Sequence, residues 1–136
     1  MRIVIAGAGV VGRRLAAQLA ADRHDVAIID LNRELCDAVS AEYGVVAICG
    51  NATDIVTLEE AEVGRAAVAV ALMGLSADNL AFSLLAHGAG VERIIARMPN
   101  PRYRAAYERA AALDGDYRLV RQRLDLIRKA TGEQSP

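Results

Sequence analysis

Ile3-Val4-Ile5-Ala6-Gly7-Ala8-Gly9-Val10-Val11-Gly12 is the stretch of this 136-residue chain that decides its fold. Four apolar residues form a run typical of a buried strand, and a glycine ends the run. The glycines follow the pattern G-x-G-x-x-G and open a segment with helical spacing of apolar residues. In this pattern Gly7 permits a sharp turn, Gly9 leaves room for a pyrophosphate, and Gly12 allows close packing of helix on strand. Free N–H groups at the start of the helix then face the anion. We therefore expect a nucleotide-binding turn made of Gly7, Ala8, Gly9, Val10, Val11 and Gly12.

The rest of the chain alternates short apolar runs with longer helical segments. Five strands are predicted, at residues 3–6, 26–29, 45–49, 67–72 and 93–97. Helices are predicted between and after them, at residues 10–21, 32–43, 54–61, 77–87 and 101–113. This alternation predicts right-handed βαβ units and an α/β, Rossmann-type, doubly wound parallel sheet with strand order 3-2-1-4-5. Residues 118–120 are a weak candidate for a sixth strand.

Polar residues and glycines mark where several of these helices begin and end. Asn32 and Ser76 stand where an N-cap residue is expected. Gly44 suits the position just after the second helix. The first helix is predicted to have one apolar face, which carries Val11, Leu15 and Leu19.

An acidic residue, Asp30, ends the second apolar run, about 20 residues after the glycine turn. A carboxylate at this place accepts hydrogen bonds from the ribose hydroxyls of adenosine and repels a 2′-phosphate, which favours NAD over NADP. The plainer alternative for Asp30 is a turn residue that ends a strand. Arg33 is the one feature suited to a 2′-phosphate, although an arginine on an exposed helical turn is more often solvated. Leu31, next to Asp30, completes the candidate contacts here.

Composition excludes several classes of function. The formal net charge is -1, without the concentrated basic face that a nucleic-acid partner requires. The longest apolar run, residues 66–75, is shorter than the roughly 18 residues of a membrane span, and the cleavage pattern of a signal peptide is missing. We therefore expect a cytoplasmic protein without direct membrane insertion. Cys36 and Cys49 form no C-x-x-C pair and are expected to be reduced, mostly buried thiols.

Five motifs occur in order between residue 1 and about residue 111. They are Ile3 to Gly12, Asp30 followed by Asn32, Gly50-Asn51-Ala52-Thr53, Ser76-Ala77-Asp78-Asn79, and Ile95-Ala96-Arg97 followed by Asn100-Pro101-x-Tyr103. Together they resemble the RCK or KTN (TrkA-N) domain. That domain is the regulatory nucleotide-binding domain of bacterial and archaeal potassium channels and of Trk/Ktr potassium uptake systems.

The resemblance implies further contacts with the ligand. Asn51 and Ala52 would border the adenine, although the family usually has aspartate in place of Asn51. Met73 and Gly74, which replace a more polar pair, would lie near the second phosphate and sugar. Arg97 would reach the cofactor phosphates or a neighbouring subunit, and its alternative role is an ion pair at a strand end.

The function implied by the resemblance is regulatory. An NAD- or NADH-binding subunit or domain would gate a potassium channel or transporter through a ligand-dependent change of assembly. Catalysis is disfavoured because no acid or base is placed at the expected crevice: His24 and His87 fall away from it, and Lys129 is the only lysine. Two alternatives remain open: a small NAD(P)-dependent oxidoreductase or its cofactor-binding subunit, and a regulatory protein whose ligand is ATP or ADP.

We divide the chain into a nucleotide-binding domain, residues 1–113, and a C-terminal helical extension and tail, residues 114–136. The family's usual sixth strand and ligand-sensing C-terminal domain are not evident in that extension. The predicted helix at 101–113 carries one apolar stripe, formed by Tyr103, Ala106, Tyr107, Ala110 and Leu113. This stripe either covers the chain's own sheet or packs on a second subunit, as the resemblance implies. The second possibility predicts a homodimer or a larger homo-oligomer.

Overall fold

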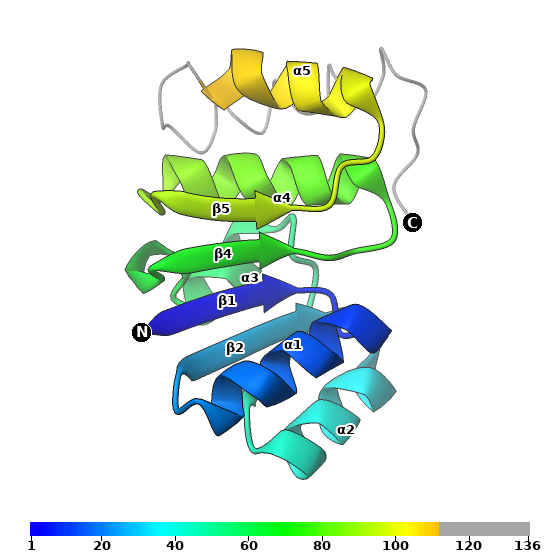
Figure 1. Ribbon diagram of the computed structural model, residues 1–136, viewed down its shortest axis with the longest axis vertical. Helices are drawn as coiled ribbons and strands as arrows, with labels where there is room; N and C mark the ends of the chain where they lie inside the picture. The colour runs from blue at the N-terminus through cyan, green and yellow to red at the C-terminus, as the bar shows by residue number, and fades with distance from the viewer. Residues whose placement is uncertain (112–136) are drawn as a thin grey trace.

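A computed structural model of the chain describes residues 1–111. Five parallel strands form one sheet in the order β3-β2-β1-β4-β5. Figure 1 shows β2, β1, β4 and β5 side by side. The strands are β1 (Arg2–Ala6), β2 (Asp25–Asp30), β3 (Val46–Cys49), β4 (Val68–Ala71) and β5 (Arg93–Ala96). The predicted doubly wound fold and its strand order are confirmed, with the switch point between β1 and β4. The candidate sixth strand lies outside the described residues.

Helices cover both faces of the sheet (Figure 1). They are α1 (Val10–Ala21), α2 (Arg33–Tyr43), α3 (Ile55–Glu60), the short 3-10 helix η1 (Val63–Arg65), α4 (Ser76–Gly88) and α5 (Pro101–Ala111). Alternate residues of β1 point to opposite faces. Ile3 and Ile5 belong to the core shared with α1 and α2, whereas Val4 and Ala6 belong to the core shared with α3 and α4. Burial on both faces explains why the strands are continuous apolar runs.

Two of the predicted helix boundaries are confirmed and one is wrong. The Asn32 side chain caps α2 by accepting a hydrogen bond from Leu35 N, and Gly44 ends that helix with a left-handed φ of 68°. Ser76, in contrast, is the first residue of α4 rather than its cap, because Leu75 occupies the cap position. On the predicted apolar face of α1, Leu15 and Leu19 pack against the core, whereas Val11 is exposed.

The apolar stripe of α5 packs on α4 within the same chain, as Figure 1 shows at the top of the molecule. Tyr103 and Ala110 are buried there, and Ala106 and Tyr107 pack partly against the same core. The stripe is therefore confirmed for these four residues, and Leu113 lies outside the described residues. Because the stripe covers the domain's own helix, α5 is not an unpartnered face.

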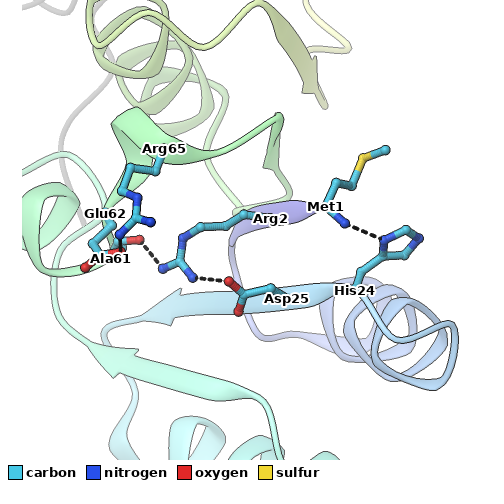
Figure 2. A network of polar contacts seen from close by, with 7 residues as sticks. All are labelled: Met1, Arg2, His24, Asp25, Ala61, Glu62 and Arg65. Atoms are coloured by element: carbon cyan, nitrogen blue, oxygen red, sulfur yellow. Dashed lines mark hydrogen bonds and ion pairs between the residues drawn. The ribbon is translucent and has the colours of Figure 1, made fainter.

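The amino ends of β1 and β2 are held together by polar contacts (Figure 2). Arg2 Nη1 donates to Asp25 Oδ2 at 2.8 Å, and Arg2 Nη2 donates to the carbonyl of Ala61 at 2.7 Å. Because Ala61 follows α3, this one side chain ties two strands to the crossover that leads to β4. The neighbouring Met1 amino nitrogen lies 3.2 Å from His24 Nδ1. The amino ends of these strands are thus joined by the protein's own polar groups, and we call this side of the sheet the amino edge.

Candidate functional site

Every candidate ligand-binding residue lies at or just beyond the carboxyl end of a strand. The residues follow the five strands in this way: Gly7, Ala8, Gly9, Val10, Val11 and Gly12 after β1, Asp30 and Leu31 at the end of β2, Asn51 and Ala52 after β3, Met73 and Gly74 after β4, and Arg97 after β5. The strands are parallel, so these loops share one edge of the sheet, the edge at the arrowheads in Figure 1. Open α/β sheets bind ligands at this edge, beside the switch point.

Two glycines of the turn are required by the fold itself. Gly7 has a φ of +111°, and a Cβ there would lie 2.6 Å from the carbonyl oxygen of Leu72. Gly12 sits so close to the turn that its Cβ would overlap the carbonyl oxygen of Gly7. Side chains at either position would push apart the turn, α1 and the β4 end.

Two other glycines at the same edge face open space. A Cβ placed on Gly9 or on Gly74 would meet no atom of residues 1–111 within 4 Å, and neither residue has a left-handed φ. Gly9 follows β1 and Gly74 follows β4, so the two flank the switch point. Neither the packing nor the backbone of this chain requires glycine at these two positions. The space beside them is available to a bound group.

Among residues 1–111, no side chain caps the start of α1. Gly9 is its N-cap residue, and the first helical bond runs from Arg13 N to Gly9 O at 2.9 Å. At α2 and α3, in contrast, the side chains of Asn32 and Asp54 accept hydrogen bonds from the first turn. The first N–H groups of α1 are therefore free of a capping side chain and, with the helix dipole, suit an anion.

Asp30 joins the glycine turn to the start of α2. Its Oδ2 accepts from Ala8 N and its Oδ1 accepts from Asn32 N, both at 2.8 Å. Each carboxylate oxygen has a further lone pair, so the group still has acceptor capacity for ribose hydroxyls. Asp30 thus has the structural role of a turn residue, which the sequence analysis gave as the alternative to ribose binding. The two roles are compatible, because each carboxylate oxygen can accept more than one hydrogen bond.

Asn51 presents a donor rather than an acceptor to its surroundings. Its Oδ1 accepts hydrogen bonds from Thr53 N at 2.9 Å and from Thr53 Oγ1 at 2.7 Å. The Nδ2 group is left as a donor on this side chain. The side chain of Ala52 is buried and that of Ala8 is fully buried, so these two residues offer the ligand only their backbones.

Three large apolar side chains are exposed beside the glycine turn. Val10 and Leu31 are each 58% exposed and Val11 is 54% exposed. Other large apolar residues, such as Val46, Val56 and Ile95, are as exposed in other parts of the fold, but these three lie next to the glycine turn. Such side chains suit contact with the base and sugars of a nucleotide.

Asn79 is the residue at this edge whose role sequence reasoning missed. Its side chain is buried, accepts from Met73 N at 2.8 Å, and donates to the carbonyls of Met73 at 3.0 Å and Arg97 at 2.9 Å. It therefore clamps the β4–α4 loop to the end of β5. Its only sequence signal is its place in the motif Ser76-Ala77-Asp78-Asn79.

Arg97 extends past the end of β5 with its side chain exposed. Its backbone N donates to the carbonyl of Ala71 at 3.0 Å, which continues the β4–β5 pairing. Within residues 1–111 the ion pairs are Arg2–Asp25 and Arg65–Glu62, so Arg97 is not part of the ion pair considered as its alternative role. Its guanidinium is accessible to an anion at the carboxyl edge.

The two thiols lie beside Asp30 and differ in exposure. Cys36 is buried, as expected, but Cys49 is exposed, which corrects the prediction of two mostly buried thiols. Cys49 ends β3, which is the outermost strand on its side of the sheet within residues 1–111. Burial is the main cause that raises the pKa of Cys36 to about 11, and the neighbouring Cys49 thiol and Asp30 carboxylate add to the shift.

No helix within residues 1–111 has the length and apolar character to cross a membrane. The same part of the chain contains no cluster of three or more His, Cys, Asp or Glu side chains suited to a metal ion.

Two solved structures are similar to this fold. The TrkA-N domain of the inner membrane protein ybaL from Escherichia coli aligns with a TM-score of 0.73 and 24% identity, over 92% of this chain and 95% of that one. The GsuK channel bound to NAD aligns with a TM-score of 0.58 and 20% identity, over 78% of this chain and 22% of that one. At these identities the likeness concerns the fold.

Sequence relatives extend the comparison. The Trk system potassium uptake protein TrkA homolog of Methanothermobacter thermautotrophicus is 41% identical over 109 residues, which are 80% of this chain and 50% of that protein. The TrkA protein of Mycobacterium tuberculosis is 30% identical over 131 residues, 96% of this chain and 59% of that protein. The chain thus spans about half the length of these relatives. The family model of the TrkA-N domain matches residues 3–115, and the chain belongs to that family.

Proposed function

We propose that this chain is an NAD- or NADH-binding regulatory domain of a potassium uptake system or potassium channel. The observation that carries the proposal is the pair of open glycines, Gly9 and Gly74, beside the uncapped start of α1. The relatives' names, Trk system potassium uptake proteins, support the link to potassium transport. The GsuK channel, solved with NAD, has the same fold and supports the choice of ligand.

The ligand would lie across the carboxyl edge. Asp30 accepts the adenosine ribose hydroxyls, and the adenine lies between Leu31 and the Asn51-Ala52 turn. The pyrophosphate lies at the start of α1, over Gly9. The second sugar and its phosphate lie beside Met73 and Gly74, and Arg97 reaches toward the phosphates. This assignment rests on the position of each residue at one edge and on the donor or acceptor it presents.

The choice among adenine nucleotides rests on Asp30. Its carboxylate repels a 2′-phosphate, so NADP should bind more weakly than NAD. ATP or ADP would use the same ribose contact and the same helix start, which makes them the competing regulatory ligands. Thermal shift with NAD, NADH, NADP, ATP and ADP separates these cases. We expect NAD or NADH to raise the melting temperature most, because only a dinucleotide reaches Gly74. A larger shift with ATP or ADP would replace NAD as the ligand.

We propose that the bound nucleotide is sensed and not turned over. Neither histidine of the chain lies at the carboxyl edge: His24 precedes β2 and contacts the Met1 amino group, and His87 lies in the last turn of α4. The competing oxidoreductase would show a steady, protein-dependent loss of NADH absorbance with a defined acceptor. We expect no such loss.

Further parts of the proposal concern assembly. Residues 1–113 would form the nucleotide-binding domain and residues 114–136 an extension of it. Two or more copies would associate, and the nucleotide would favour one arrangement over another. A membrane potassium channel or transporter subunit would sense that change from the cytoplasmic side, with this chain peripheral to the membrane. Nucleic acid is not a proposed partner.

A further inference from the structure

Cys36 and Cys49 come from different elements and meet at the carboxyl end of β2. Cys36 lies in the first turns of α2, and Cys49 ends β3, where it pairs in register with Asp30. The Cys36 thiol donates to the carbonyl of Asp30 and the Cys49 thiol donates to the carbonyl of Leu31, each at 3.4 Å. The two sulfurs are thus held by consecutive carbonyl groups of one short segment.

The two thiols lie at one point of the fold although they come from two elements. Each donates to one of two consecutive carbonyl groups, those of Asp30 and Leu31. Thiols held in this way are placed to form a disulfide, which requires close approach of the two side chains. The thiols differ in access, because Cys49 is exposed and Cys36 is buried. A dissolved oxidant therefore meets Cys49 first.

We propose that Cys36 and Cys49 are a reversible redox pair, converted to a disulfide by hydrogen peroxide at the adenosine end of the nucleotide site. In the first step the Cys49 thiolate attacks one oxygen of the peroxide. The O–O bond breaks, Cys49 becomes a sulfenic acid and hydroxide leaves. In the second step the Cys36 sulfur attacks the Cys49 sulfur, the S–O bond breaks and the Cys36 proton leaves with the oxygen as water. Two thiols lose two electrons and two protons, and one peroxide is reduced to two waters.

The raised pKa of Cys36 fits the role of the second, resolving thiol. At neutral pH Cys36 is protonated and buried, so it reacts poorly with oxidants from solution. The sulfenic acid of Cys49, held beside it, is the partner that it meets. Intracellular disulfides of this kind are usually transient redox sensors, and a thiol reductant reverses them.

Oxidation of the two thiols should depend on the bound nucleotide. This part of the inference rests on the proposed function. Cys49 bonds to the carbonyl of Leu31 and lies two residues before Asn51, and both Leu31 and Asn51 border the proposed adenine position. A nucleotide bound there would cover the Cys49 sulfur. NAD should therefore slow the oxidation in proportion to the fraction of sites occupied.

The test uses the reduced full chain, which has two cysteines in all. The protein is treated with hydrogen peroxide, alkylated with iodoacetamide and weighed by intact mass spectrometry. We expect the loss of two hydrogen atoms, no alkylation, and a cross-linked peptide containing both cysteines, all reversed by dithiothreitol. Cys36→Ser should stop at the sulfenic acid of Cys49, which dimedone captures. Cys49→Ser should leave Cys36 as an unoxidised thiol.

Two results would overturn the redox pair: a wild-type protein that carries dimedone on Cys49 while Cys36 stays alkylatable, or disulfides formed mainly between chains. The effect of NAD on the rate of oxidation is measured separately. With NAD at ten times its dissociation constant, oxidation should be about tenfold slower. If NAD binds by calorimetry without slowing the disulfide, the redox pair stands and the adenine position is wrong. If NAD does not bind at all, the proposed function fails while the mass measurement still decides on the pair.

Discussion

Gly9 and Gly12 are three residues apart and have different surroundings, which makes them a matched pair of test positions. A Cβ on Gly9 would meet only open space, whereas one on Gly12 would overlap the carbonyl of Gly7. Gly9→Ala should therefore cost about 0.5–1 kcal/mol of stability, the ordinary loss for alanine at a helix N-cap. Its added methyl group would occupy the pyrophosphate position, so NAD affinity measured by calorimetry should fall about tenfold or more.

Gly12→Ala serves as the control for this prediction. Because its Cβ meets backbone rather than a flexible side chain, urea unfolding should show a loss of about 1–3 kcal/mol or more. Unchanged NAD affinity in a folded Gly9→Ala variant would remove the pyrophosphate from the start of α1.

Asp30 combines two roles that one substitution can separate. Asp30→Asn keeps a side-chain oxygen to accept from Ala8 N or Asn32 N but removes the negative charge. We expect the variant to fold and to lose about tenfold of its preference for NAD over NADP, roughly 1.4 kcal/mol, because the 2′-phosphate is no longer repelled. The check is the ratio of the two dissociation constants. An unchanged ratio would leave Asp30 with its structural role alone.

The loop between β4 and α4 is positioned by one side chain from the helix that follows it. Asn79→Ala would leave the N–H and carbonyl of Met73 and the carbonyl of Arg97 without their partner. We expect a loss of about 1–3 kcal/mol in urea unfolding, together with weaker NAD binding, because the segment bearing Gly74 is no longer held.

A variant at the opposite edge distinguishes this effect from general destabilisation. Arg2→Met removes the bonds to Asp25 and Ala61 and should also lower stability, but it lies at the amino edge and should leave NAD affinity unchanged. If both variants reduce affinity equally, Asn79 acts through overall stability and not by positioning the loop.

Helix ends that are set by residues close in sequence could be predicted. Loops that are held by residues farther away in sequence could not. Asn32 and Gly44 act within four residues of themselves, so the sequence predicts their positions correctly. The partners of Asn79 lie 6 and 18 residues away, and no local pattern reveals them. Val11 matches the helical period of the buried face, yet it lies in the first turn of α1, at the carboxyl edge, where it is exposed.

At the scale of the whole molecule, a stabilised amino edge faces away from an open carboxyl edge. At the amino edge, Arg2 joins two strands to the residue that follows α3. At the carboxyl edge, Gly9, Gly74 and the uncapped start of α1 leave room for a ligand. The sequence could predict this carboxyl edge because parallel strands bring their loops together. It could not predict the exposure of Cys49, which depends on β3 being the last strand on its side.

Assembly is the remaining prediction at this scale. Light scattering of the wild type should show a dimer or larger species. Tyr107 is only partly buried on α4, so its exposed part can still contact a second subunit, and Tyr107→Asp should give a smaller species. Because Tyr107 also packs partly on the chain's own core, circular dichroism must show that the variant is folded. A wild-type protein that stays monomeric at high micromolar concentration, with and without NAD, would contradict the assembly mechanism and leave the nucleotide site untouched.

The division among the glycines has an evolutionary consequence. Gly7 and Gly12 are required by packing, whereas Gly9 and Gly74 are left for a ligand. A lineage that gave up its nucleotide would therefore keep the first pair under purifying selection, while the second pair would be free to drift. Residues at positions 9 and 74 would then record when binding was lost, even in descendants whose fold had not changed.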